Sequence, residues 1–236
     1  MLRTFFFYLF FYPWTLIASF LALIVSFFGQ NRTHSFVRFW GRSCLFFAGL
    51  KVQVQGSENI SYDRPAIYVS NHQSNFDILI VYAGLPIQFR WMAKQELFRV
   101  PIFGLAMKRC GIIPIDRSNR RKTMHSIIAA AQRIKKGASV VIFPEGTRTP
   151  DGKLQKFKKG ALLIAAKAQV PVVPIAIHGS YHVQSKDRWK INGGPLKLEF
   201  LKPISTDDLK RSDINALTNK VHDQIARSLQ GATIDG

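Results

Sequence analysis

The feature that most constrains the fold of this chain is a long uncharged segment near its amino terminus. No charged residue lies between Phe5 and Phe28, and apolar residues, many of them phenylalanine, fill most of this run. A helix needs about 20 apolar residues to cross the ~30 Å hydrocarbon core of a bilayer, so the run is long enough to span a membrane. It is too long for the apolar part of a signal peptide, and no small-x-small cleavage motif follows it. Pro13 is expected to kink the helix, because proline removes a backbone donor.

A second apolar and aromatic segment, Ser35–Leu50, follows the first. Arg38 and Arg42 lie four positions apart in it, so both cations fall on one face of a helix. This arrangement is typical of an interfacial helix whose arginines meet lipid headgroups. We therefore expect residues 1–50 to form a two-helix membrane anchor, which either spans the bilayer as a hairpin or lies in one leaflet.

Strand-like and helix-like segments alternate from Lys51 onward. Short β-branched runs predict strands, and longer amphipathic runs predict helices. This alternation is typical of an α/β domain with a mixed, largely parallel sheet flanked by helices, which we expect over residues 51–236. The predicted strands are 52–55, 66–70, 89–93, 112–115, 139–143, 172–177 and 196–201, and the predicted helices are 76–83, 102–109, 120–135, 160–168 and 213–229.

The net charge of the chain limits the kinds of partner that it is expected to bind. Lysine and arginine number 33 against 14 aspartate and glutamate, which gives a net charge of +19. A basic body suits an anionic partner, either nucleic acid or the anionic face of a membrane, and the uncharged amino-terminal run favours the membrane. Cys44 and Cys110 form neither a metal-binding nor a redox spacing, so we expect no metal, no disulfide and a reducing compartment.

The first chemical motif is Asn71–Asp77, directly after a predicted strand. Five residues apart on one helix, His72 and Asp77 would point about 140° away from each other, so the chain must bend between them. Ser74, three residues before Asp77, predicts a helix start at that bend. Asp77 could then bind one ring nitrogen of His72 and leave the other free as a general base. The alternative is that Asp77 only caps the helix and His72 is an ordinary loop residue.

The second motif is Phe143–Thr149, at the end of another predicted strand. Arg148 offers a planar guanidinium suited to phosphate, and Gly146 allows the backbone to approach a ligand closely. Glu145 could align Arg148 or contact a hydroxyl. The alternative is a surface salt bridge within a turn.

Lys94 ends a predicted strand and could add a second phosphate contact, or could simply be a solvated lysine. His178 and His182 follow a strand and are weaker candidates for lining the same pocket. Ser70 and Ser74 do not sit in the Gly-x-Ser-x-Gly turn of a serine hydrolase, so covalent catalysis is not expected. The chain also lacks a Walker loop and a dinucleotide-binding fingerprint.

Together these motifs resemble those of the glycerolipid acyltransferases, specifically the 1-acyl-glycerol-3-phosphate acyltransferases. The resemblance covers roughly residues 50 to 205, and the amino-terminal helix pair is similar to that of bacterial members. The matching blocks occur in order along the chain and are Asn71–Asp77, Lys94–Arg117, Phe143–Thr149 and Val170–Ile175.

The resemblance implies an enzyme, a 1-acylglycerol-3-phosphate O-acyltransferase, that moves an acyl chain from a thioester to the 2-hydroxyl of lysophosphatidate and gives phosphatidate. It implies His72 as general base and Asp77 as the residue that orients it, with direct attack in a ternary complex. The donor would be acyl-coenzyme A or acyl-acyl carrier protein as a co-substrate, with no cofactor. The residues it implies for substrate binding are Lys94, Arg117, Glu145, Gly146, Thr147 and Arg148.

Location and alternatives follow from the same observations. We expect the inner membrane, with contact to membrane lipids and the catalytic domain facing the cytoplasm, since positive charge favours that side. A related acyltransferase acting on another lysophospholipid or on glycerol 3-phosphate stays open. A more remote alternative is a non-enzymatic, membrane-attached nucleic-acid binder, against which the two aligned motifs argue, so we expect no nucleic acid partner. Acyl-chain length, the donor and the oligomeric state also stay open.

Overall fold

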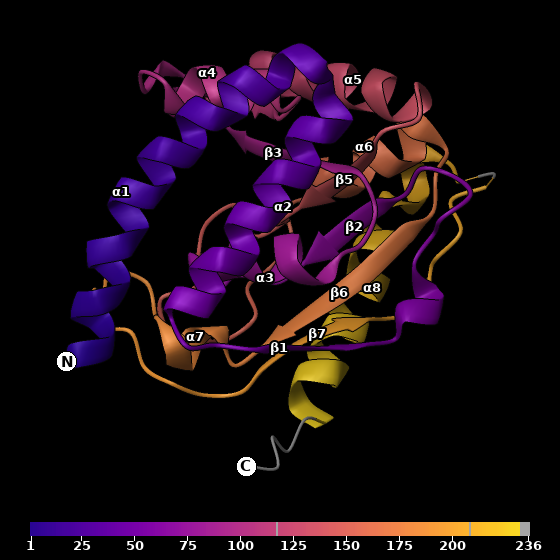
Figure 1. Cartoon of the computed structure of the whole chain (residues 1–236). Coiled ribbons are helices and arrows are strands. Elements are labelled where there is room, and N and C mark those ends of the chain that lie inside the picture. Colours follow the sequence, from indigo (N-terminus) through magenta and orange to yellow (C-terminus); the bar gives the residue numbers. More distant parts are fainter. Residues whose placement is uncertain (117, 208, 232–236) are drawn as a thin grey trace.

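The computed structural model describes residues 1–116, 118–207 and 209–231. A seven-stranded sheet lies at its centre, and a hairpin of two long helices runs along one side (Figure 1). The strands are β1 (Val52–Gln55), β2 (Ile67–Ser70), β3 (Phe89–Lys94), β4 (Ile113–Ile115), β5 (Ser139–Ile142), β6 (Val172–His178) and β7 (Leu196–Phe200). The helices are α1 (Leu2–Val25), α2 (Gln30–Phe47), α3 (Phe76–Gly84), α4 (Phe103–Arg109), α5 (Arg120–Lys135), α6 (Lys159–Ala168), α7 (Ser180–Val183) and α8 (Ile214–Gly231), with 3-10 helices η1 (Ser26–Phe28), η2 (Ser57–Asn59), η3 (Gln95–Arg99) and η4 (Arg211–Asp213) between them.

The sheet has the strand order β1-β7-β6-β2-β5-β3-β4. All neighbouring pairs are parallel except β6 and β7. Parallel neighbours need long crossover connections, which the helices between β2 and β6 supply. The expected mixed, largely parallel α/β sheet is confirmed, and every predicted strand and helix after residue 50 ends within two residues of its observed bounds. The short helix α7 was not predicted.

The two faces of the sheet bury separate cores, because successive side chains of a strand point to opposite faces. In β2, Tyr68 joins the core beneath α1, α2, α3 and α7. Its neighbours Ile67 and Val69 join the core beneath α5, α6 and α8. The amino-terminal hairpin therefore contributes to the interior of the molecule as well as to its surface.

The amino-terminal hairpin differs from the expected pair of membrane helices. α1 continues through Pro13 as one helix and is followed by η1. Within the described part of the chain, Leu2–Phe28 is the one helix long and apolar enough to cross a membrane. α2 begins at Gln30, earlier than expected, and its first turns are polar. The sequence-based expectation of two such helices is therefore corrected to one. α2 is the second helix of the hairpin, and it packs against α1 and α3.

Arg38 and Arg42 of α2 were expected to face lipid headgroups, but they bind the end of α3 instead. Nε of Arg38 donates to the Tyr82 carbonyl at 3.3 Å, and the Arg42 guanidinium donates to the Ala83 carbonyl at 3.4 Å. The last carbonyls of a helix lack partners within the helix and carry partial negative charge. Both arginines therefore join α2 to the carboxyl end of α3. Gly41 lies at the same contact.

The three predicted motifs meet at one edge of the sheet. β2, β5 and β3 are neighbours and run parallel, so their carboxyl ends lie together. His72 follows β2, the turn Phe143–Thr149 follows β5, and Lys94 ends β3. Ligands of open α/β sheets bind beyond the carboxyl ends of the strands, so a binding site is expected at this edge.

Candidate active site

His72 and Asp77 form a hydrogen-bonded pair. Nδ1 of His72 lies 2.8 Å from Oδ2 of Asp77. The Asp77 side chain is fully buried, whereas His72 lines a cavity. An aspartate that accepts from Nδ1–H leaves Nε2 with its lone pair, so the pair is suited to proton abstraction by Nε2.

The chain bends between the two residues at the start of α3, as predicted. Oγ of Ser74 accepts from the backbone N–H of Phe76 at 3.1 Å. Oδ2 of Asp77 accepts from the backbone N–H groups of Gln73 at 2.7 Å and Ser74 at 2.8 Å. Together with His72, this places three donors on one carboxylate oxygen at a helix amino terminus, where negative charge is stabilised. Asp77 therefore binds the backbone at the start of α3 and orients the imidazole at once, so the alternative in which it only caps the helix is not what the structure contains. The role of His72 as a general base stays a prediction.

The turn after β5 holds the backbone of His72 from both sides. Oε1 of Glu145 accepts from the His72 N–H at 2.6 Å, and the Thr149 N–H donates to the His72 carbonyl at 2.9 Å. Oε2 of Glu145 accepts from the Gln155 N–H at 3.2 Å. Both carboxylate oxygens of Glu145 thus bind backbone groups, and its side chain is buried outside the cavity lining. The structure gives Glu145 this positioning contact, in place of the expected alignment of Arg148.

Glu145 is also electrostatically unusual. Burial raises the pKa of its carboxyl to about 7, the backbone donors of His72 and Gln155 oppose the rise, and the charge of Asp77 adds to it. A carboxyl that holds its proton up to neutral pH makes the fold around His72 sensitive to pH.

Aromatic stacking fixes the plane of the imidazole. The ring of Phe143 lies 3.9 Å from that of His72, centroid to centroid, at an interplanar angle of 7°. Trp91 of β3 stacks on the other side of this arrangement, 5.1 Å from Phe143. From the sequence, Phe143 was placed at the end of a strand and the start of the second motif, without a role of its own. The sequence feature that could have indicated a contact with His72 was the position of Phe143 at the end of a predicted strand, directly before the Pro-Glu-Gly turn.

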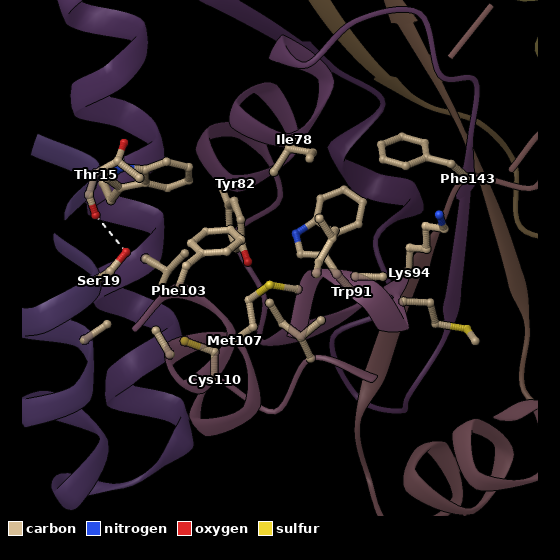
Figure 2. A pocket seen from close by; sticks show the side chains of 18 of the residues that line it. Thr15, Ser19, Ile78, Tyr82, Trp91, Lys94, Phe103, Met107, Cys110 and Phe143 are labelled. Carbon is tan, nitrogen blue, oxygen red and sulfur yellow. Dashed lines mark hydrogen bonds between the residues drawn. The ribbon is translucent and has the colours of Figure 1, made fainter. Parts of the chain in front are cut away.

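A cavity of about 520 Å³ extends from His72 into the space between the sheet and the helical hairpin. This volume is in the range of sites that bind small molecules. Figure 2 shows Thr15 and Ser19 of α1 on one side of the cavity and Lys94 and Phe143 on the other. Most of its lining is apolar or aromatic, and the labelled side chains between these two sides are Ile78, Tyr82, Trp91, Phe103, Met107 and Cys110.

Gly146, Thr147 and Arg148 line the same cavity as His72. Gly146 has a φ of 78°, a conformation that glycine adopts readily, and this turns the chain toward the cavity. Arg148 is half-buried. No ion pair joins it to a carboxylate among the described residues, so the expected alternative of a surface salt bridge is not what the structure contains.

Lys94 and Arg117 are the two other residues expected to bind substrate. Lys94 lines the cavity, but its side chain is exposed and its Nζ lies 3.4 Å from Oε1 of Glu96. Its contact with phosphate stays a prediction. Arg117 lies outside the described residues.

The remaining histidine candidates do not line this cavity. His178 is buried, with Nε2 3.1 Å from Oε2 of Glu199, and Oγ of Ser228 donates to the same oxygen at 2.9 Å. This cluster joins β6, β7 and α8. His182 is exposed on α7. Among the described residues, no group of three or more histidine, cysteine, aspartate or glutamate side chains is placed to hold a metal ion.

Comparison with known proteins identifies the family. The family model described as Acyltransferase matches residues 51–178, which include His72, Asp77 and the turn after β5. The chain belongs to the acyltransferase family. A solved acyltransferase from Thermotoga maritima, the 1-acyl-sn-glycerophosphate (LPA) acyltransferase PlsC, matches this structure with a TM-score of 0.83 and 30% sequence identity, over 97% of this chain and 94% of that one.

Curated members of the acyltransferase family are also similar. The chain is 36% identical over 202 residues to the chloroplastic 1-acyl-sn-glycerol-3-phosphate acyltransferase LPAT1 of Arabidopsis thaliana, and the match covers 85% of this chain and 55% of that protein. It is 32% identical over 192 residues to the human 1-acyl-sn-glycerol-3-phosphate acyltransferase alpha, with 81% and 68% covered. The chain thus spans little more than half the length of its chloroplastic relative.

One residue of this acyltransferase site was named in the motif without a role. The side chain of Asn71 accepts from the Ile177 N–H at 2.8 Å and donates to the Ile177 carbonyl at 2.9 Å. The Asn71 side chain thus makes the two hydrogen bonds to β6 that a backbone residue of a neighbouring strand would make. These bonds fix the position at which β2 ends, directly before His72. An amide side chain directly after an apolar strand was the only signal for this role.

Proposed function

We propose that this acyltransferase transfers an acyl chain from an acyl thioester to the 2-hydroxyl of 1-acyl-sn-glycerol 3-phosphate and gives phosphatidate. The observation that carries the proposal is the His72–Asp77 pair on the wall of an apolar cavity that Arg148 also lines. A hydroxyl nucleophile needs a base, an acyl chain needs an apolar space, and a phosphate needs a fixed cation. The names of the Arabidopsis, human and Thermotoga proteins support the same acceptor.

In the proposed reaction, Nε2 of His72 accepts the proton of the 2-hydroxyl while the hydroxyl oxygen attacks the thioester carbonyl carbon. The C–O bond forms, the C–S bond breaks, and the imidazolium returns the proton to the departing thiolate. Asp77 keeps Nδ1–H oriented and stabilises the imidazolium, as the aspartate of a catalytic triad does. Direct transfer is favoured because the hydroxyls of Ser70 and Ser74 are buried and bonded to neighbouring backbone groups.

The acceptor headgroup would sit at the turn after β5. Arg148 can offer two parallel N–H donors to a phosphate, and Gly146 and Thr147 form the wall beside it. Lys94 at the rim would supply a second, more solvated cation. The donor is a co-substrate, either acyl-coenzyme A or acyl-acyl carrier protein, and the scheme requires no cofactor.

We further propose that α1 attaches the protein to the inner membrane, with the basic body on the cytoplasmic side. The apolar length of Leu2–Phe28 supports membrane attachment, and the net charge of +19 suits an anionic leaflet. A lysolipid could then keep its acyl chain in the bilayer while its headgroup reaches the cavity.

The test is an acyl-transfer assay with the full-length protein and lysophosphatidate in vesicles. Each donor is supplied separately and the products are identified by mass. Phosphatidate is the expected product, and His72→Ala serves as the inactive control. A different lysophospholipid or glycerol 3-phosphate as the preferred acceptor would assign the chain to a related acyltransferase. Failure to consume either thioester with every acceptor would contradict the enzymatic proposal.

A further inference from the structure

Five large apolar side chains stand exposed on η3, α4 and the link between them. Leu97, Val100, Ile102, Phe103 and Leu105 each have between 38% and 50% of their surface exposed. We call this group the η3–α4 tip. Single exposed apolar residues are ordinary, but a contiguous group marks a surface that contacts another apolar phase.

The tip is a compact structure. A Cβ at Gly104 would lie 2.4 Å from the Phe98 carbonyl oxygen, so only glycine lets η3 pack this closely on α4. Ile102 has a φ of 61°, which is strained for a β-branched residue. Strain of this kind persists where the surroundings hold it and is common at functional segments. The close packing therefore joins η3 to α4.

The tip continues the apolar face of α1. Figure 1 shows α4 beside the carboxyl-terminal part of α1, and the two helices are in contact. Phe20 and Ile24 of that part are exposed, as is Phe27 of η1, which follows α1 directly. The guanidinium of Arg109, at the end of α4, lies 5.6 Å from the centre of the Phe27 ring. The two elements therefore present one joined apolar surface.

Cations border this surface. Arg99, Lys108 and Arg109 are all exposed and lie within or beside the tip. Long basic side chains around an apolar patch suit the anionic headgroup layer of a bilayer, while the apolar side chains enter the acyl-chain layer beneath it. A second copy of this chain fits less well, because it would bring the same cations face to face.

The tip is one of the places where residues that line the cavity are exposed. Leu97 and Phe103 line the cavity and are exposed at the same time. In Figure 2, Phe103 and Met107 of α4 lie around the cavity together with residues of α1. The apolar cavity thus lies against both helices and has exposed lining residues at the tip.

We propose that the η3–α4 tip is a second membrane-contacting surface, which enters the same leaflet as the outward face of α1 and opens the cavity toward the acyl-chain layer. The partner of this surface is a bilayer that contains anionic phospholipid. The use of the opening by a lysolipid rests on the proposed function, whereas the membrane contact itself does not.

Fluorescence from a labelled cysteine tests the contact. Cys44 and Cys110 are buried, so a thiol introduced as Leu105→Cys in the full-length protein takes an environment-sensitive dye selectively. On vesicles of phosphatidylethanolamine and phosphatidylglycerol, we expect its emission to shift to the blue and to be quenched by spin labels on the acyl chains. Tyr62→Cys is the matched control, because Tyr62 is exposed but precedes β2, at the opposite edge of the sheet. The dye at this position should show neither effect.

Two outcomes would overturn the proposal. One is a dye at position 105 that stays in water while the protein sediments with the vesicles. The other is a blue shift that grows with protein concentration when no vesicles are present, which would assign the tip to contacts between copies. These readings need no turnover, so they stand even if the acyltransferase assay fails.

A variant with Val100→Asp and Leu105→Asp tests the consequence for substrate. Neither residue lines the cavity. We expect a severalfold loss of turnover with lysophosphatidate in vesicles and unchanged turnover with a short-chain acceptor dispersed in water. Equal losses with both acceptors would contradict the proposal, because they would mean that the tip supports the fold and not access from the bilayer.

Discussion

His72 is fixed at every group it possesses except Nε2. Its backbone N–H and carbonyl bind Glu145 and Thr149, Nδ1 binds Asp77, and its ring stacks on Phe143. A base held in this way loses little freedom when a substrate arrives, and such positioning is a large part of catalytic power.

Replacement of the base should remove most of the activity. We expect His72→Ala to lower kcat by about 10² to 10⁴, the usual contribution of a positioned general base. Asp77→Asn should cost less, because the amide oxygen still orients the ring but the negative charge is lost. The matched control is His182→Ala, which changes an exposed histidine outside the cavity. Wild-type turnover in purified His72→Ala protein would rule out the mechanism.

Glu145 should make the stability of the fold depend on pH. Its folded-state pKa of about 7 lies above the ordinary value of 4.5, so the folded protein retains a proton that the unfolded chain releases. The contribution of Glu145 to the free energy of unfolding should therefore be largest below pH 4.5 and fall by about 3 kcal/mol as the pH rises to 7. Denaturation in detergent micelles across this range measures the effect. Glu145→Gln should remove this part of the slope, whereas Glu58→Gln, at an exposed site, should leave it.

Arg148 should act on the acceptor. A charge-assisted hydrogen bond is worth about 1.5–3 kcal/mol, so Arg148→Ala should lower kcat/KM for lysophosphatidate by roughly tenfold to a hundredfold, mainly through KM. Arg148→Lys should restore only part of it, since lysine lacks the planar pair of donors. An acceptor without a phosphate monoester provides the comparison and should lose little. Unchanged constants for lysophosphatidate would place the phosphate elsewhere.

At the scale of elements, α3 is held at both ends. Its first turn contains Asp77, and its last carbonyls accept from Arg38 and Arg42 of α2. The contact between α2 and α3 is close because Gly41 has no side chain: a Cβ there would lie 2.8 Å from Cβ of Tyr82. The hairpin and the helix that carries Asp77 thus form one packed unit.

This contact predicts a destabilising substitution. Gly41→Ala adds a methyl group against the buried Tyr82, and overpacking of this kind costs about 1–3 kcal/mol, which should exceed the gain in helix propensity of about 1 kcal/mol. We expect a lower thermal unfolding midpoint in detergent. Gly160→Ala in α6 is the control, since its Cβ would meet only the flexible end of Ile127 at 3.3 Å. An equal or higher midpoint for Gly41→Ala would show that α2 and α3 can separate without cost.

The elements themselves were predictable to a large extent. The central strands β2, β5 and β6 are rich in β-branched residues, β1 and β7 alternate apolar and polar residues, and α8 shows a clear amphipathic period, so local pattern was sufficient for these elements. The same holds for His72 and Asp77, whose meeting follows from a helix start at known spacing. The roles of Glu145, Asn71 and Arg38 were not predictable, because each binds a backbone group far away in the sequence, and polar side chains at a turn or on a helix give no sign of a distant partner.

At the scale of the whole molecule, two kinds of membrane contact should be separable by salt. Apolar insertion of α1 does not depend on ionic strength, whereas attraction between a body of net charge +19 and anionic lipid is screened. The protein should therefore stay with vesicles in about 1 M salt, where the screening length is about 3 Å, while turnover of embedded lysophosphatidate falls. Co-sedimentation and product analysis on the same samples measure both. Release by salt would mean that charge alone holds the protein to the membrane.

The attachment of α2 to α3 has a practical consequence for handling this enzyme. Asp77, which binds Nδ1 of His72, and Tyr82, whose carbonyl binds Arg38, lie on the same nine-residue helix. A detergent that bends the hairpin therefore acts on the reaction centre directly, even when the sheet is intact. The choice of membrane mimetic becomes a kinetic variable, and inactive preparations with normal circular dichroism are the expected sign of a poor choice.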